Sequence, residues 1–128
     1  MKVLKAYPPN IDQIQKVLNP PFATVFTYGD TIYNPNVDAE LPPDLVAHER
    51  VHMFQQMKFL TPGEWWDKYL KDENFRFNQE VEAYKAQWKI MRHSRMANWL
   101  LHGIVTDLSG AMYGNLVSYT IARRLIKS

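Results

Sequence analysis

Residues 42–60 read Pro-Pro-Asp-Leu-Val-Ala-His-Glu-Arg-Val-His-Met-Phe-Gln-Gln-Met-Lys-Phe-Leu, and this stretch decides the expected fold. A proline pair followed by Asp44 favours the start of a helix, and no Gly or Pro interrupts the next sixteen positions. One apolar stripe at helical spacing consists of Val46, Met53, Met57 and Leu60. We expect this stripe to pack against the rest of the protein and the opposite face to present polar groups.

Positions 48–52 of this helix form the sequence H-E-x-x-H. Residues four apart on a helix are neighbours, so the imidazoles of His48 and His52 can bind one metal ion. Glu49 lies beside them and can take a proton from a zinc-bound water, whose pKa the ion lowers to about 7. We therefore expect Zn²⁺ as cofactor and Glu49 as the catalytic base. The alternative is a pair of surface or core histidines that bind no metal.

A catalytic zinc needs a third protein ligand and one open position. The downstream candidates are Glu64, Asp67, Asp72, Glu73, Glu80, Glu82, His93, His102 and Asp107. Glu80 is favoured because it shares a helix face with Tyr84 and Gln87, beside the expected core residues of that helix. Glu82 is the rival, but an offset of two residues turns it about 200° around the helix, so only one of the two can serve.

Residues 45–56 and 79–84 resemble the two motifs of the gluzincin zinc metallopeptidases, H-E-x-x-H on one helix and a ligand Glu on the next long helix. The resemblance spans roughly residues 31–87. It implies a zincin-like domain, zinc ligation by His48, His52 and Glu80, and peptidase activity with Glu49 as base. Many gluzincins carry an Asp where this chain has Tyr84, so a tyrosine hydroxyl or a backbone carbonyl is expected to orient the ligand histidine.

A β-hairpin is expected upstream of the motif helix. Residues 22–28 and 31–33 are rich in β-branched and aromatic side chains, and Gly29-Asp30 between them suits a tight turn. The gluzincin resemblance implies an edge strand that binds substrate, and the second strand is our candidate. Thr31, Ile32 and Tyr33 are therefore the expected substrate-binding residues, acting through main-chain hydrogen bonds to an extended peptide.

Five further helices follow from periodicity and capping signals. They are expected over residues 11–18, from Thr61-Pro62 to about 72, from Asn74 or Asn78 to about His93, over 96–108, and from Ser118 to 126. Of the pair Trp65-Trp66 we expect one ring in the core and one half exposed, with a substrate-pocket wall as the alternative. The fold class is thus α+β and mostly helical, with a small N-terminal hairpin, in a single domain of residues 1–128.

Composition excludes several classes of function. The 128 residues carry 15 basic and 13 acidic side chains, and a net charge of +2 gives no reason to expect a nucleic-acid partner. The absence of cysteine excludes disulfides, thiol nucleophiles and the Cys ligand that peptide deformylases use. The first residues contain no secretory signal, so we expect a protein that is cytoplasmic or released without a signal peptide. Residues 99–122 hold one formal charge, but their polar and Gly residues argue against a membrane span.

The function expected from the sequence is that of a zinc-dependent metallohydrolase, an enzyme that cleaves a peptide or protein substrate. For the group that stabilises the oxyanion, Tyr84, His93 and His102 are candidates, and none is assigned. Two other classes remain open. One is a non-enzymatic binding or structural protein with a metallopeptidase-like fold and a structural or absent zinc. The other is a membrane-surface protein anchored through residues 99–122.

Overall fold

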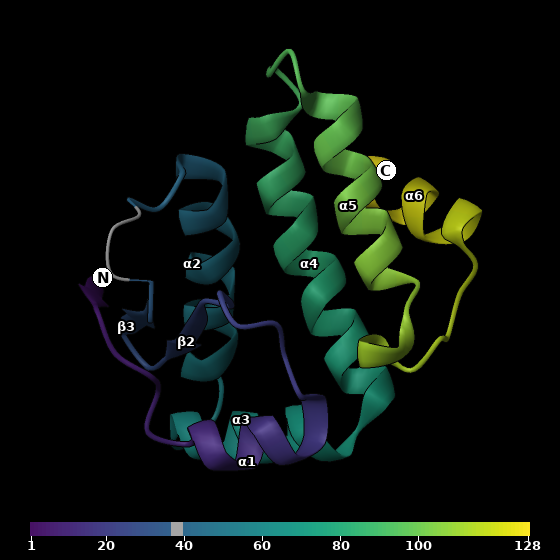
Figure 1. Ribbon diagram of the computed structural model, residues 1–128. Coiled ribbons are helices and arrows are strands. Elements are labelled where there is room, and N and C mark those ends of the chain that lie inside the picture. Colours follow the sequence, from purple (N-terminus) through teal and green to yellow (C-terminus); the bar gives the residue numbers. More distant parts are fainter. Residues whose placement is uncertain (37–39) are drawn as a thin grey trace.

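Six α-helices and a three-stranded sheet make up the computed structural model, which describes residues 1–36 and 40–128 (Figure 1). The strands are β1 (Lys2–Leu4), β2 (Phe26–Tyr28) and β3 (Thr31–Tyr33). The helices are α1 (Ile11–Leu18), α2 (Pro43–Met57), α3 (Pro62–Lys71), α4 (Glu73–Met91), α5 (Ala97–Leu108) and α6 (Tyr119–Lys127), with a 3₁₀ turn η1 (Ala111–Tyr113). Of the described residues, 61% are helical, which confirms the mostly helical α+β class.

The predicted hairpin is present, but it is part of a larger sheet. β2 and β3 pair antiparallel around a turn in which Gly29 takes a positive φ of 63°. β1 pairs in parallel with the other side of β3, with Val3 opposite Ile32, so the strand order is β1-β3-β2. β3 is therefore the central strand, and the prediction that residues 31–33 form an edge strand is wrong. Its hydrogen-bonding groups are used by neighbours on both sides.

Side-chain caps begin three of the helices. The Thr61 hydroxyl accepts from the N–H of Glu64 at the start of α3, and Ser118 accepts from the N–H of Ile121 at the start of α6. Both helix starts agree with the sequence signals. α4 begins at Glu73, slightly before the predicted Asn74 or Asn78, because the Asp72 carboxylate caps it.

Two apolar clusters hold these elements together. The first joins α4, α5, η1 and α6 through the buried residues Phe77, Met91, Leu101, Ile104, Val105, Leu108, Tyr113, Ala122 and Ile126. The second joins α1, β2 and α3 through Ile14, Phe26, Trp65, Trp66, Tyr69 and Leu70. Helix α2 packs alongside α4 (Figure 1), yet it contributes no buried residue to either cluster.

The buried face of α2 is the polar one. Met57 is 70% exposed and Leu60, just beyond the helix, is 91% exposed, so the prediction that the apolar stripe packs inward is wrong. The side chains that α2 buries are His48, Glu49, His52, Gln55 and Gln56. Burial of polar groups is tolerated where they are hydrogen-bonded, and these groups make such bonds to one another, to α4 and to β2.

No helix within the described ranges is long and apolar enough to cross a membrane. The segment 99–122, which the sequence left open as a membrane anchor, is divided among α5, η1 and the first turn of α6.

Candidate metal centre

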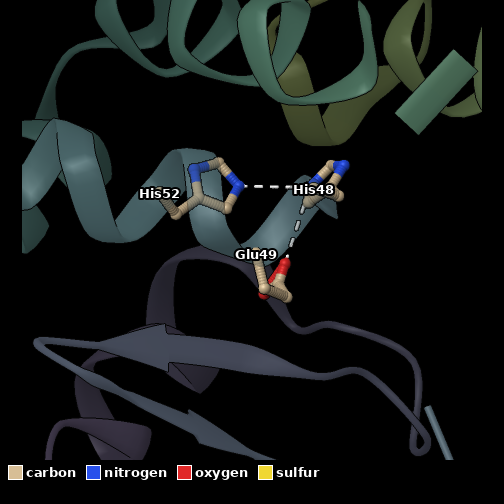
Figure 2. A group of neighbouring side chains, drawn as sticks. All are labelled: His48, Glu49 and His52. Atoms are coloured by element: carbon tan, nitrogen blue, oxygen red, sulfur yellow. Dashed lines mark hydrogen bonds and ion pairs between the residues drawn. The ribbon is translucent and has the colours of Figure 1, made fainter. Parts of the chain in front are cut away.

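Consecutive turns of α2 bring two imidazoles together. The Nε2 atoms of His48 and His52 lie 3.1 Å apart, and the rings meet edge to face with centroids 4.8 Å apart. Figure 2 shows the two rings side by side on the helix, with Glu49 extending from the same turn. The Oε2 atom of Glu49 lies 3.7 Å from Nε2 of His48. The arrangement predicted from the H-E-x-x-H spacing is thus present in the fold.

Helix α4 adds the carboxylate of Glu80 to this pair. Its Oε1 lies 3.2 Å from Nε2 of His48, and its Oε2 lies 3.1 Å from Nε2 of His52. Two ligand atoms about 2.1 Å from one zinc ion at the tetrahedral angle are about 3.4 Å apart. Imidazole and carboxylate groups are ligands that zinc takes in proteins, and each of these pairwise distances is within a few tenths of an ångström of that spacing.

Glu49 and Glu82 are the other carboxylates to consider as the third ligand. Metal-binding atoms of His48, Glu49 and His52 lie within 4.8 Å of one another, so this set could also hold an ion. We favour Glu80 because each of its oxygens is close to one of the imidazoles, whereas Glu49 approaches only His48, at the longer distance. Glu82 is exposed and does not line the cavity that contains these residues.

A glutamine orients His52. Nδ1 of His52 lies 2.8 Å from Oε1 of Gln55, and Nε2 of Gln55 donates to the carbonyl of Gln79. The carbonyl of Gln79 can only accept, so the NH₂ group of the Gln55 amide must face it and the amide oxygen must face His52. Because this oxygen can only accept, Nδ1 of His52 carries the proton. In the neutral ring this leaves the Nε2 lone pair free for a metal. The expectation that a tyrosine hydroxyl or a backbone carbonyl orients the histidine is wrong for His52.

His48 is held differently. The ring of Tyr84 packs edge-on against it with centroids 4.6 Å apart, and among the described residues its buried Nδ1 has no hydrogen-bond partner. Tyr84 thus contacts the site through its ring.

Opposite charges stabilise the Glu80–His52 pair. Burial disfavours the charged form of His52, but the charge and hydrogen bond of Glu80, together with smaller contributions from Glu49 and Gln55, outweigh burial and raise the pKa of His52 to about 9. Burial alone would raise the pKa of Glu80, yet the neighbouring histidines hold this pKa well below its usual range. In the metal-free protein, the pair is therefore an imidazolium and a carboxylate at neutral pH.

Glu49 is positioned by the sheet. The hydroxyl of Thr27 on β2 lies 3.3 Å from Oε1 of Glu49 and 3.2 Å from its main-chain oxygen, so it can donate to either. Burial raises the pKa of Glu49 above its ordinary value, although the charges of both histidines oppose this. A carboxylate with a raised pKa accepts a proton more readily, as a general base must.

A cavity of about 350 Å³ adjoins these residues. Its wall includes both Trp65 and Trp66, and both are buried, so the prediction of one half-exposed ring is wrong and the alternative of a pocket wall describes their placement. Thr31, Ile32 and Tyr33 do not line the cavity, which on the sheet side is formed by β2 and residues 23–25 before it. The lining carboxylates are Glu49, Glu80 and Asp107, and no Lys or Arg of the described chain is among the lining residues.

Of the three oxyanion candidates, only Tyr84 lines the cavity. His93 and His102 are exposed, and Nδ1 of His102 lies 2.8 Å from the hydroxyl of Tyr119. Tyr69 and Tyr113 also line the cavity, and sequence reasoning missed both as site residues. Tyr69 lies on the buried face of α3, which the helical spacing of apolar residues in the sequence indicates. Tyr113 lies in a 3₁₀ turn that no periodicity marks.

Comparison of the chain with protein-family models, with curated proteins and with solved structures gives no match. The chemistry of this protein therefore has to be inferred from the residues of the site itself.

Proposed function

We propose that this chain is a zinc-dependent hydrolase of the gluzincin type, acting as a peptidase, in a zincin-like fold. His48, His52 and Glu80 bind the metal, and Glu49 is the general base. The observation that carries the proposal is the convergence of two imidazole nitrogens and one carboxylate at 3.1–3.2 Å in a buried site. Glu49 stands immediately beside this donor set.

The donor set favours a catalytic site over a structural one. Structural zinc sites are closed by four protein ligands, whereas catalytic sites use three and keep one position open. Here Glu80 has an oxygen within 3.2 Å of each imidazole, whereas Glu49 approaches within 4.0 Å of His48 alone, at 3.7 Å from its Nε2. The adjoining cavity gives a substrate room to approach.

Each side chain then has a defined task. Zinc, when bound, polarises a carbonyl and acidifies water. Glu49 accepts a proton from the attacking water and later delivers it to the leaving amine. The hydroxyl of Thr27, 3.3 Å from Oε1 of Glu49, can hold this carboxylate in place by a hydrogen bond. The wall of Trp65, Trp66 and Tyr69 excludes bulk solvent, which strengthens the electrostatic interactions inside.

The test compares the parent protein, purified without chelator, with Glu49→Gln and with Glu82→Gln, an exposed control on α4. We expect about one zinc per chain in all three by elemental analysis. We expect the parent and Glu82→Gln to cleave a broad peptide mixture and Glu49→Gln to lose cleavage, because a carboxamide cannot accept the proton. If the zinc-loaded parent cleaves no peptide, or if Glu49→Gln cleaves at the parental rate, the peptidase proposal is wrong.

A further inference from the structure

The Glu80 carboxylate accepts a hydrogen bond from a hydroxyl that has no role in the proposed reaction. Tyr69 on α3 donates a hydrogen bond to Oε2 of Glu80 at 2.7 Å, and both residues are 4% exposed. A hydrogen bond from a neutral hydroxyl to a buried carboxylate is among the stronger kinds in proteins. Each oxygen also lies near one imidazole, Oε1 at 3.2 Å from Nε2 of His48 and Oε2 at 3.1 Å from Nε2 of His52. The two oxygens of Glu80 therefore differ by the Tyr69 hydroxyl, which contacts Oε2.

Tyr69 itself is held on several sides. Its ring stacks on Trp65 with centroids 4.8 Å apart and meets Trp66 edge-on at 5.2 Å. Arg76 lies over the same ring at 5.7 Å, and its Nε donates to the carbonyl of Tyr69. Because ring and backbone are both held, the phenol oxygen stays within hydrogen-bond distance of Glu80.

We propose that Tyr69 is a positioning residue that holds Glu80 as a one-oxygen ligand, and this inference rests on the metal site proposed above. A carboxylate can bind a metal through one oxygen or through both. With Oε2 bound to the Tyr69 hydroxyl, Oε1 is the donor, and the site keeps the open position that catalysis needs. Without the hydroxyl, Oε2 is free to turn towards the metal and fill that position.

The experiment uses Tyr69→Phe with Tyr119→Phe as its matched control. Tyr119→Phe also removes a hydroxyl contact, of 2.8 Å to His102, but Tyr119 does not line the cavity. Two quantities are measured: the zinc dissociation constant by competition with a coloured chelator, and the visible absorption of the cobalt(II)-loaded protein. Four-coordinate cobalt(II) absorbs more strongly than five- or six-coordinate cobalt(II). We expect Tyr69→Phe to bind zinc about 10- to 100-fold more weakly and to show weaker cobalt bands, with Tyr119→Phe unchanged.

The variant Glu80→Ala serves as a second background, which distinguishes a positioning role of Tyr69 from a general loosening of the fold. In Glu80→Ala, which keeps the two imidazoles, adding Tyr69→Phe should leave the residual zinc affinity unchanged, because the ligand through which Tyr69 acts is gone. A further drop in affinity in the double variant would show that Tyr69 acts through the fold and would overturn the inference. Equal zinc affinity and equal cobalt spectra in the parent and Tyr69→Phe would also overturn it.

A crystal structure of the zinc-loaded parent tests the inference even if Tyr69→Phe does not fold. One Glu80 oxygen on zinc and the other on the Tyr69 hydroxyl supports it, and both oxygens on zinc refutes it. If the parent protein binds neither zinc nor cobalt, the proposed function is wrong as well. If the parent binds both metals but has the same zinc affinity and cobalt spectrum as Tyr69→Phe, only this inference is wrong.

Discussion

Gln55 and His52 form a hydrogen-bonded pair within a single turn of α2, with Oε1 of Gln55 2.8 Å from Nδ1 of His52. The residue that fixes the ring therefore comes from the helix that carries the ring. Gln55 in turn donates to the carbonyl of Gln79, the residue directly before Glu80. The Gln55 amide thus fixes the ring orientation of His52, a proposed ligand on α2. It also fixes the backbone next to Glu80, a proposed ligand on α4.

We predict that Gln55→Met weakens zinc binding about 10- to 100-fold, because the ligand histidine loses the acceptor for its Nδ1–H. Gln56→Met is the matched control. Gln56 is equally buried and also makes two side-chain hydrogen bonds, but to Gly29 and Thr27. Both variants should lose about 1–3 kcal/mol of stability in urea unfolding. A normal zinc affinity in Gln55→Met, or equal losses of affinity in both variants, would contradict this role.

A second prediction concerns the ligand set. His48→Ala, His52→Ala and Glu80→Ala should each lose zinc or bind it much more weakly, since each removes one of three donors. Glu82→Ala should keep its zinc, because Glu82 is exposed on another face of α4. Equilibrium dialysis followed by elemental analysis decides the matter. Loss of zinc in Glu82→Ala with retention in Glu80→Ala would reverse the assignment of the third ligand.

Zinc binding should release a proton at neutral pH. The pKa of His52 is raised from 6.5 to about 9, so in the metal-free protein this ring is charged below about pH 9, whereas a metal ligand must be neutral. We expect about one proton per zinc at pH 7.5, none from this ring well above pH 9, and weaker zinc binding as the pH falls. Titration calorimetry in two buffers of different ionisation enthalpy measures this release. Identical heats in the two buffers at pH 7.5 would contradict the prediction.

The charge of the cavity predicts a substrate preference. Its lining holds three carboxylates and no Lys or Arg, and Asp107 is the one that takes no part in the proposed metal centre. Peptides with Lys should be cleaved with a kcat/KM roughly two- to fivefold higher than matched peptides with Glu, since partly exposed charge pairs contribute about 0.2–1 kcal/mol. Asp107→Asn and high salt should both reduce this preference, whereas Glu82→Gln should not. A preference for Glu peptides would show that Asp107 does not face the substrate.

Local signals predicted the helices well, because caps and breakers act over only a few residues. Thr61 and Ser118 show this directly through their capping hydrogen bonds, whereas the Asp72 cap, which begins α4 at Glu73, was not predicted. Helical spacing likewise predicted that His48 and His52 lie together, and the shared face with Tyr84 indicated that Glu80 points inward.

Contacts between segments that are distant in the sequence explain the predictions that were wrong. β1 is three residues long and pairs with a strand nearly thirty positions later, so no local pattern marks it. The buried face of α2 was missed for a related reason. Hydrophobic patterning assumes that polar groups face water, and partners such as Thr27, Gln79 and Glu80 become visible only when distant segments meet.

The lack of any buried α2 side chain in the two apolar clusters has a consequence for the stability of the fold. A metal bound by His52 and Glu80 would join α2 to α4 across a loop that contains the whole of α3, and because such a site exists only in the folded chain, binding there stabilises the folded state. The ion then acts as a cross-link between the polar face of α2 and the helix that carries the first apolar cluster. In this protein, catalysis and cohesion would depend on the same three side chains.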